Sequence, residues 1–534
     1  MKLTLEGIGQ TSEWNNVGIK LPKYDAASVK QVTAENPEWV HFGAGNIFRG
    51  FIGSIAQSLL NQGLSKTGII AVETFDFDII DKIYEPYDSL TLNVMMDKSS
   101  NLDMVVQAGI TEGIKSDEYA RLTEIAENPS LKMISYTITE KGYNIYAPDG
   151  GLMGVVKSDI ENGANEPKHA MSVTAYMLYK RFKAGKYPIA VVSMDNCSHN
   201  GEKLKTSVMT IAEKWAENGS VEKEFIDYLN ECVSFPWSMI DKITPRPSDT
   251  VLSKLAELGI EDMQPVVTSK GTYIAPFVNA EIPQYLVVED DFPNGRPALD
   301  KAGVYMTTRE TVNKSETMKV TTCLNPLHTA LAVYGCLLGY TTIWEEMKDN
   351  DLVNLVRKIA DEGMKVVINP GIIDPDKFVK EVIEERLPNP NIPDAPQRIA
   401  TDTSQKVGIR YGETIKSYVK SNALDVNDLK AIPMAIAGWI RYLIAVDDNG
   451  NTFERSADPL LDDLSAKLDG VTLGNPDSID GKLTGILSDK TIFGVDLYEI
   501  GLGERIENTV KAMLKGNGAV REALKTIYKG GILQ

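Results

Sequence analysis

Cysteine and histidine are both scarce in this chain of 534 residues, which contains four of each. The cysteines are Cys197, Cys232, Cys323 and Cys336. None of them stands in a CxxC or CxxH pair, so the sequence predicts neither a disulfide framework nor a zinc knuckle. The histidines are equally dispersed, and distant segments would have to converge to build a metal site from them. We therefore expect no bound metal.

The chain also lacks any block of basic residues. It has 55 lysines and arginines against 74 aspartates and glutamates, a formal net charge of −19. A nucleic-acid or acidic-membrane partner needs a basic face, so we expect neither. No apolar stretch is long enough to span a bilayer, and the N-terminus "MKLTLEGIGQTSEWNN" lacks the apolar run of a signal peptide. We expect a cytoplasmic monomer or small homo-oligomer.

Apolar strands and amphipathic helices alternate in the first half of the chain. In "EWVHFGAGNIFRGFIGSIAQSLLNQG" a short apolar run is followed by a glycine turn and by Ile47, Phe51, Ile55 and Leu59 at helical spacing. "TGIIAVETFDFD", "LKMISYTITEKGY" and "YPIAVVSMDNCSHNG" continue the pattern as strands that end in polar loops. Such alternation is typical of a doubly wound parallel sheet.

From about residue 310 nearly every segment reads as amphipathic helix. The sequence therefore predicts an α/β protein, with an N-terminal Rossmann-type doubly wound sheet followed by a mainly α-helical C-terminal domain. We expect an arm over residues 1–36 that packs on the first domain, a Rossmann-type domain over 37–298, and a helical substrate or catalytic domain over 299–534.

The glycine turn "GAGNIFRG" stands where a dinucleotide-binding loop would. Gly43 would permit the tight turn, Gly45 would let the backbone approach a pyrophosphate, and the helix N-terminus would attract that anion. Phe48 replaces the usual third glycine, and Arg49 could supply a charge for phosphate. The alternative is a tight turn that only packs a helix on a sheet, with Arg49 in solvent.

An acid at the end of the second strand, Glu73, could accept both adenosine ribose hydroxyls and would repel a 2′-phosphate. No Arg or Lys follows in "TFDFDIID", so NAD is favoured over NADP as the cofactor. The spacing from the glycine turn is longer than usual, which leaves Thr74 or Asp76 as alternatives. The predicted cofactor-binding residues are Gly43, Gly45, Asn46, Ile47, Arg49, Glu73 and Thr74.

Two further loops carry polar side chains at strand ends. Glu140 in "TITEKGY" could relay protons, unless it belongs to a solvated Glu-Lys turn. Asn196 in "SMDNCSHNG" could donate a hydrogen bond to a carbonyl or alkoxide, unless it only bonds its own turn.

The stretch "MKVTTCLNPLHTAL" places Lys319, Asn325 and His328 in a segment that otherwise reads as buried helix. A lysine whose pKa is lowered by desolvation could act as acid/base, an asparagine could polarise the reacting oxygen, and a histidine could anchor substrate. Alternatively, Asn325 is an N-cap with Pro326 at the first helical position, and His328 is a core residue satisfied by its neighbours.

Five of these segments resemble the polyol-specific long-chain dehydrogenases, the mannitol dehydrogenase family. They are "HFGAGNIFRGF", "TITEKGY", "SMDNCSHNG", "MIDKITP" and "MKVTTCLNPLHTAL", in family order from about 41 to 330. The resemblance implies an NAD-dependent, metal-independent dehydrogenase. The roles it implies are general acid/base for Lys319, polarisation of the reacting oxygen for Asn196 and Asn325, substrate contact for His328 and Asp241, and a proton-channel gate for Glu140.

One departure from the family bears on geometry, because the family usually has Lys-x4-Asn-x2-His and this chain has five residues between Lys319 and Asn325. At about 100° per residue, an unbroken helix would put Lys319 and His328 on opposite faces. We therefore predict a π-bulge, kink or chain break between Lys319 and Asn325, and Pro326 supplies a reason for it.

The segment "PQRIATDTSQKVGIRYGETI" (396–415) resembles the fructuronate-reducing branch of the family more than the mannitol branch. It concentrates Arg398, Lys406 and Arg410, which suit a substrate carboxylate that mannitol does not have. An ordinary basic helix face is the alternative. The expected substrates are thus D-mannonate and D-fructuronate, with mannitol/fructose and altronate/tagaturonate as alternatives. A non-catalytic NAD-binding protein is the alternative from another class.

Overall fold

The computed structural model of the protein describes residues 1–527, which form two compact units. The first unit comprises Met1–Asp97 and Asn101–Asn313, and the second comprises Lys98–Ser100 and the chain from Lys314 onward. The sequence placed residues 299–313 in the second domain. They belong to the first, because strand β14 (Tyr305–Thr307) pairs with β13 (Tyr285–Glu289) there.

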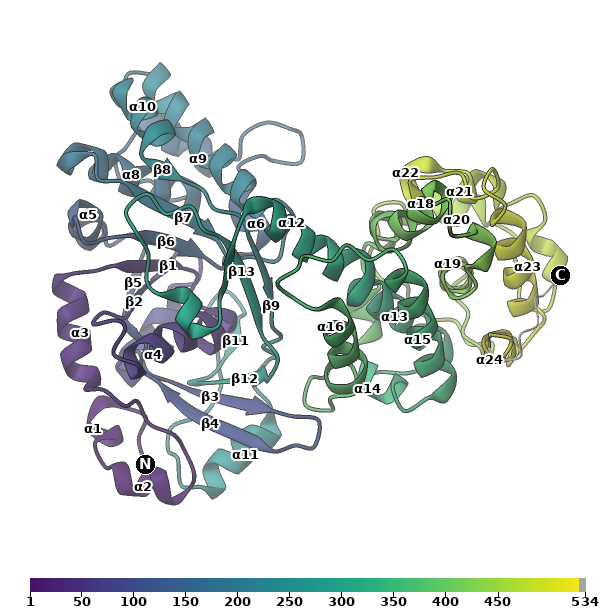
Figure 1. Ribbon diagram of the computed structural model, residues 1–534, viewed down its shortest axis with the longest axis horizontal. Helices are drawn as coiled ribbons and strands as arrows, with labels where there is room; N and C mark the ends of the chain where they lie inside the picture. The colour runs from purple at the N-terminus through teal and green to yellow at the C-terminus, as the bar shows by residue number, and fades with distance from the viewer. Residues whose placement is uncertain (528–534) are drawn as a thin grey trace. The chain divides into compact units, whose positions relative to one another are not determined.

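The first unit is built on a six-stranded parallel sheet. Its strands in spatial order are β5 (Ile110–Lys115), β2 (Ile69–Glu73), β1 (Trp39–Phe42), β6 (Met133–Tyr136), β7 (Ile189–Ser193) and β8 (Val233–Ser234). The chain moves outward from β1 in one direction and then, from β6, in the other (Figure 1). Such a reversal opens a crevice at the carboxyl ends of the strands, which is where doubly wound sheets bind ligands. The predicted Rossmann-type sheet is confirmed.

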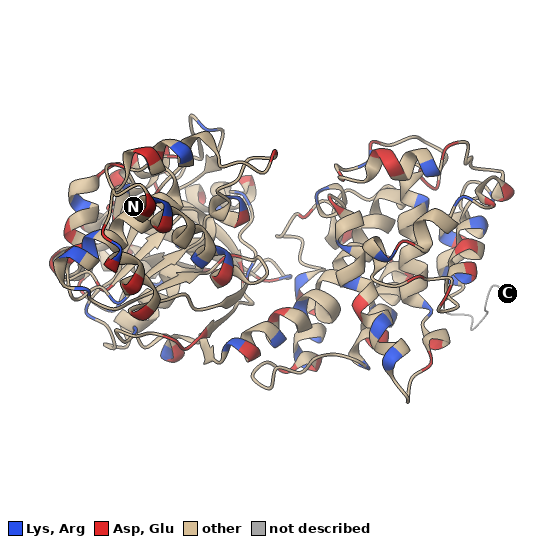
Figure 2. Cartoon of the chain, turned by 90° about the horizontal axis from the view of Figure 1, so that it is seen from above, with Lys and Arg blue, Asp and Glu red and all other residues tan. Residues whose placement is uncertain are grey.

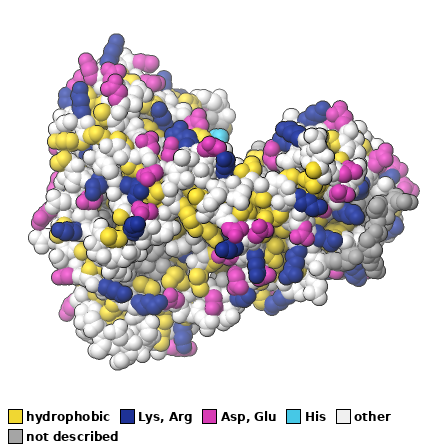
Figure 3. Space-filling model, viewed as in Figure 1, with side chains coloured by type: hydrophobic (Ala, Val, Ile, Leu, Met, Phe, Trp, Pro, Cys, Tyr) yellow, Lys and Arg dark blue, Asp and Glu magenta, His cyan; other side chains and the backbone are white. Residues whose placement is uncertain are grey.

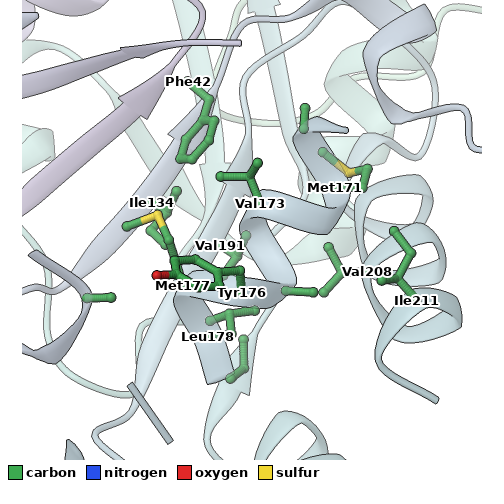
Figure 4. Packing of buried hydrophobic residues seen from close by; sticks show 14 of the residues in the cluster. Phe42, Ile134, Met171, Val173, Tyr176, Met177, Leu178, Val191, Val208 and Ile211 are labelled. Carbon is green, nitrogen blue, oxygen red and sulfur yellow. The ribbon is translucent and has the colours of Figure 1, made fainter. Parts of the chain in front are cut away.

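Helices cover both faces of this sheet. They are α4 (Gly53–Asn61), α5 (Tyr119–Glu127), α6 (Thr139–Tyr143), α7 (Gly154–Asn162), α8 (Ala170–Gly185), α9 (Asn200–Glu217) and α10 (Glu224–Glu231). Alternate residues of a strand point to opposite faces. Val40 and Phe42 of β1 therefore join the core under α8 and α9, in which Figure 4 shows Phe42. Trp39 joins the core under α4.

Smaller elements complete the first unit. The remaining strands are β3 (Thr91–Met96), β4 (Leu102–Gln107), β9 (Ser238–Asp241), β10 (Val266–Val267), β11 (Tyr273–Ile274) and β12 (Phe277–Glu281). The remaining helices are α1 (Leu5–Ile8), α2 (Thr11–Asn16), α3 (Ala26–Glu35), η1 (Phe48–Ile52), η2 (Ile80–Tyr84), η3 (Glu85–Tyr87), α11 (Asp249–Glu257) and η4 (Leu299–Ala302). The N-terminal arm packs on this unit through Leu3, Trp14 and Ile19, which are buried with residues of β3 and β4.

The second unit is helical. Helix α12 (Arg309–Met318) leads into it, followed by η5 (Lys319–Cys323), α13 (Asn325–Leu338), α14 (Ile343–Glu346), α15 (Asn350–Met364), α16 (Pro375–Glu381), η6 (Val382–Arg386), α17 (Pro396–Ile399), η7 (Thr403–Gln405), η8 (Gly408–Gly412), α18 (Glu413–Lys420), η9 (Val426–Asp428), α19 (Ala431–Leu443), α20 (Leu461–Lys467), η10 (Pro476–Ile479), α21 (Thr484–Leu487), α22 (Lys490–Phe493), α23 (Gly503–Met513) and α24 (Ala519–Lys525). Helices α13 and α19 are hydrophobic on all sides and pack on each other. A helix of that kind has to lie in a core.

Charged side chains of both signs are interspersed over the surface of each unit (Figure 2), and the face drawn in Figure 3 shows the same mixture. Among the described residues, no helix combines the length and the apolar character that a membrane crossing requires.

The core of the second unit holds one carboxyl group in an unusual position. Glu346 is 0% exposed, and neither of its carboxyl oxygens has a hydrogen-bond partner within the described chain. A Cβ added to Gly335 would lie 1.9 Å from its Oε1, so the glycine makes room for the group. Burial, and then the charges of Asp349 and Asp394, raise the pKa of Glu346 well above its ordinary value.

This pKa predicts a specific loss of stability with rising pH. The folded state holds the carboxyl proton of Glu346 more tightly than the unfolded state does. The contribution of this proton to the free energy of unfolding is therefore complete below the unfolded-state pKa of about 4.3. Above that pH the free energy of unfolding falls by about 1.4 kcal/mol per pH unit until the folded pKa is reached. Glu346→Gln should remove this slope, whereas Asp361→Asn, an exposed change on α15, should keep it. Thermal unfolding of the three proteins between pH 5 and 9 measures the difference, and parallel curves would contradict the prediction.

Candidate active site

The glycine turn after β1 has the geometry that a bound pyrophosphate requires. Gly43 adopts φ +101°, and a Cβ there would lie 2.2 Å from the carbonyl oxygen of Thr137, so only glycine fits. A Cβ on Gly45 would meet nothing within 4 Å, which leaves the backbone open to a ligand. The next residues, Asn46 and Ile47, form the first turn of the helix, where amide groups are without intrahelical partners. The residues of this turn therefore fit a dinucleotide.

Glu73 is used by the protein itself. Its Oε2 accepts a hydrogen bond from the amide of Ala44 at 3.0 Å, and its Oε1 accepts from the amides of Thr74, Phe75 and Asp76 at 2.9–3.2 Å. Three of these bonds end on Oε1 and one on Oε2, so Oε2 keeps a lone pair for a ribose hydroxyl. Glu73 therefore joins the glycine turn to the loop after β2, and its contact with the ribose stays a prediction.

The two alternatives to Glu73 differ from each other. Asp76 is 3% exposed, and its Oδ2 accepts from the hydroxyls of Thr268 and Thr272, both at 2.6 Å. Thr74 is half-buried, and no hydrogen bond from its hydroxyl is found within the described chain. Thr74 is thus the better placed of these two for a ribose contact.

Arg49, the predicted charge for a phosphate, is buried, and it does not lie in solvent as the alternative required. It is 0% exposed and donates from Nη1 to Ala275 O and from Nη2 to Asn46 Oδ1, both at 2.8 Å. Burial lowers the pKa of its guanidinium to about 10. Arg49 therefore holds Asn46 in place and does not present its charge to a phosphate.

Phe48 shows how the turn does without a third glycine. Its ring stacks on the imidazole of His41 with centroids 4.1 Å apart and 3° between the planes. His41 is itself fixed by Ser135 Oγ at 2.6 Å and Thr137 Oγ1 at 2.8 Å. The stacked rings of Phe48 and His41 thus pack the helix against β1. In the usual motif, a third glycine allows that close contact.

One side chain that the sequence did not single out, Asp195, joins the two remaining loops. Its carboxylate accepts from the amides of Ile138 and Thr139 at 2.8 and 2.9 Å and from Tyr143 Oη at 2.6 Å. The loop that carries Glu140 is thereby bound to the loop that carries Asn196. The sequence did contain a sign of this role, because Asp195 is an acidic residue at the end of a strand, directly before Asn196.

Glu140 and Asn196 are both exposed, and Glu140 pairs with Lys203 on α9. Thr139 adopts φ +64°, a strained value for a β-branched residue, and Asp195 holds it there. The third predicted residue, Asp241, ends strand β9 and is 8% exposed.

Removing the Asp195 carboxylate should release the loop over residues 138–143. Asp195→Ala leaves the amides of Ile138 and Thr139 without their acceptor and the Tyr143 hydroxyl with Ser193 as its remaining partner. Such a loss costs about 1–3 kcal/mol for each group that is buried. We expect faster hydrogen exchange at Ile138 and Thr139 and a lower thermal midpoint. Asp195→Asn, which keeps an acceptor oxygen, should lose less. Equal exchange rates in the wild type and the alanine variant would contradict this role.

In the second unit, the predicted interruption after Lys319 is present. Residues Lys319–Cys323 form a π-helix, in which the amide of Leu324 bonds Lys319 O, five residues back, at 3.1 Å. Leu324 leaves helical geometry with φ −131° and ψ −61°, and α13 begins at Asn325. Lys319, only 1% exposed, is therefore not on one regular helix with His328.

The N-cap position of α13 is Leu324. Asn325 is thus not the N-cap residue that the structural alternative to a catalytic role required. Among the described residues, no side-chain hydrogen bond caps the start of α13. The start of α13 is instead held by η8, where Tyr411 donates its hydroxyl to Pro326 O at 2.9 Å and Arg410 donates from Nη1 to Thr329 Oγ1.

His328 belongs to an ionic group with Asp394 and Arg398. Its Nε2 lies 3.3 Å from Asp394 Oδ2, and Arg398 donates to both oxygens of Asp394 at 2.7 and 2.6 Å. Burial lowers the pKa of His328, and its bond to Asp394 opposes that shift only in part. Burial raises the pKa of Asp394, but His328 and Arg398 outweigh it, so the pKa of Asp394 is lowered. Near neutral pH the carboxylate is ionised and the imidazole neutral.

Arg398 and Arg410 are both close enough for their charges to lower the pKa of His328 and that of Lys406. They do not form the face of one regular helix, because α17, η7 and η8 divide the segment. Arg398 is 71% exposed and already paired with Asp394. Arg410 is half-buried, burial lowers its pKa to about 10, and within the described chain no carboxylate forms an ion pair with it. Lys406 is similar, with its pKa lowered by burial and then by Arg410, and its ammonium bonds Thr401 O.

Sequence comparison assigns both units. Residues 37–301 match the mannitol dehydrogenase Rossmann domain, and residues 311–514 match the mannitol dehydrogenase C-terminal domain. The chain belongs to the mannitol dehydrogenase family. It is accordingly a dehydrogenase that acts on CH–OH groups, as the resemblance of its motifs indicated.

Relatives and solved structures agree with this assignment. The chain is 52% identical over 533 residues to the D-mannonate oxidoreductase of Thermotoga maritima, with 99% of each protein covered. The mannitol 2-dehydrogenase of Pseudomonas fluorescens, solved as a ternary complex with NAD and D-mannitol, superposes with a TM-score of 0.71 at 25% identity, covering 99% of this chain and 100% of that one. A D-sorbitol dehydrogenase has the same fold, with a TM-score of 0.79 at 24% identity, 95% of this chain and 97% of that one being covered.

Proposed function

We propose that this dehydrogenase interconverts D-mannonate and D-fructuronate with NAD as its cofactor. The observation that carries the substrate is the 52% identity, over essentially the whole of both chains, with a protein named D-mannonate oxidoreductase. The half-buried Arg410, with no carboxylate partner in the described chain, supports it. A sugar acid brings the anion that such a cation needs, whereas a polyol does not.

The first unit binds the dinucleotide at the carboxyl ends of its strands. The backbone at Gly45, Asn46 and Ile47 receives the pyrophosphate, and Thr74 contacts the adenosine ribose. NAD supplies or accepts the hydride. The protein orients the dinucleotide, because the hydrogen bonds of Glu73 with Ala44 and of Arg49 with Asn46 hold the glycine turn in place.

The second unit supplies the proton and binds the substrate. Lys319 exchanges the proton with the substrate hydroxyl, and its burial provides the desolvated setting that this role needs. Asn325 polarises the reacting oxygen, and His328 holds another substrate hydroxyl. In the first unit, the family motifs give Asn196 the role of an oxygen-polarising group and Asp241 that of a substrate contact. Glu140, whose carboxylate pairs with Lys203 of α9, gates proton exchange with water.

The substrate carboxylate is bound by Arg410, with Lys406 adding charge. Arg398 is occupied by Asp394, so its role is to hold the carboxylate of Asp394 against His328. We expect a cytoplasmic enzyme, monomeric or a small homo-oligomer, and no nucleic-acid or membrane partner.

Substrate choice tests the carboxylate contact. NADH oxidation by the wild type should be faster with fructuronate than with tagaturonate or fructose. Arg410→Met should lower kcat/KM for fructuronate by about 100-fold, the loss expected for one desolvated charge pair. The slow reaction with fructose should fall far less, because it loses only the bond from Arg410 to Thr329 at the start of α13. Arg398→Met is the matched control and should cost less. A wild-type preference for fructose, or an equal loss on both substrates, would contradict the assignment.

Replacing Lys319 tests the proton transfer. Lys319→Met keeps an apolar stem of similar length and should lower kcat by about 10²- to 10⁴-fold. Because the lysine is placed with the substrate and not with the dinucleotide, NADH binding measured by fluorescence should be unchanged. Normal turnover by this variant would remove Lys319 from the mechanism.

A further inference from the structure

The loop after β2 presents an aromatic ring to solvent beside the dinucleotide turn. Phe75 is 72% exposed, although its backbone is fixed by the bond from its amide to Glu73 Oε1 at 2.9 Å. The other oxygen of that carboxylate accepts from Ala44 in the glycine turn. Single exposed apolar side chains are ordinary on a protein surface, so the exposure of Phe75 has meaning only through its surroundings.

A hairpin from a distant part of the chain is fastened against this loop. Strands β10 and β11 pair antiparallel, and the turn between them is tied to Asp76 through the hydroxyls of Thr268 and Thr272. The amide of Ser269 also donates to Asp78 Oδ2 at 2.7 Å. Asp76 is 3% exposed, so the anchor is buried and the hairpin is held at a fixed place.

The anchored hairpin brings a cation to the ring and carries an exposed apolar side chain of its own. Lys270 at the tip of the hairpin has its Nζ 5.4 Å from the centroid of the Phe75 ring. Val267 on β10 is 63% exposed. An aromatic ring, a cation within cation–π distance and an aliphatic side chain are a combination that favours a flat, electron-rich ring as ligand.

We propose that Phe75 and the β10–β11 hairpin form a clamp for the adenine base of the dinucleotide. In a doubly wound sheet the adenosine half lies at the carboxyl end of the second strand, and Phe75 follows that strand by two residues. The inference rests on the proposed use of NAD. It adds that affinity for the adenosine half comes from stacking on Phe75, with Lys270 supporting the ring.

Calorimetric binding to the full-length protein tests the clamp, with ADP-ribose and nicotinamide mononucleotide as probes. Stacking of a base on an aromatic side chain accounts for roughly tenfold or more in affinity. Phe75→Ala should weaken ADP-ribose binding by at least about tenfold and leave nicotinamide mononucleotide unaffected. Phe75→Tyr should bind like the wild type, and Lys270→Met should lose a few-fold. In turnover, Phe75→Ala should raise KM for NADH with kcat unchanged.

Leu64→Ala is the matched control. Leu64 is 48% exposed, and it follows α4, the crossover helix, at the opposite edge of the sheet. It should bind both probes like the wild type. Undiminished ADP-ribose binding by Phe75→Ala would overturn the clamp, and a change in its mass in solution as well would show that the ring is a contact between copies of the chain. If the wild type bound neither ADP-ribose nor NADH, the proposed cofactor itself would be wrong, and the clamp with it.

Discussion

The carboxylate of Glu73 is the interaction on which the first unit's site depends. Strands that end at the same edge of a sheet leave loops whose amides have lost their ladder partners, and one buried anion satisfies four of them. This fixes the glycine turn relative to the loop after β2. The same loop places Asp76, which in turn fastens the β10–β11 hairpin. Glycine turn, exposed ring and hairpin are therefore one connected assembly built around two acidic side chains, Glu73 and Asp76.

The second unit depends on a different constraint, the departure from helical geometry at Leu324. The π-helix before Leu324 and helix α13 after it are each regular. Because the break separates them, the 100° spacing of a single helix does not fix the directions of Lys319 and His328 relative to each other. Tyr411 and Arg410 then hold the beginning of α13. Keeping Arg410 half-buried without a carboxylate costs free energy in the unliganded protein. A protein tolerates such a cost where a ligand supplies the missing charge, which is why we propose this cation as the carboxylate anchor.

Local pattern was enough for several of these features. Apolar runs that end in polar loops predicted the parallel sheet, and the family order of five short segments predicted the dehydrogenase. The extra residue between Lys319 and Asn325 predicted the interruption, because helical phase is simple arithmetic on spacing. In each case the evidence lay within a few residues of the feature itself. Residues 299–313 were misassigned because the strand that holds them in the first unit, β14, is short and pairs with a partner that sequence spacing does not reveal.

Some side chains are bound by near neighbours in sequence, such as Arg398 by Asp394, and others by partners far away in sequence. The sequence by itself determined which residues stand at the carboxyl ends of the strands and that the Lys319 segment could not be one straight helix, since both follow from periodicity. Only the tertiary structure decided that Arg49 donates a hydrogen bond to Ala275, 226 residues away, and that Lys270 lies over the ring of Phe75. It likewise decided that Arg410, rather than Arg398, has no carboxylate partner in the described chain. A side chain's free charge or lone pair depends on what has already bound it, and those partners are brought together only by folding.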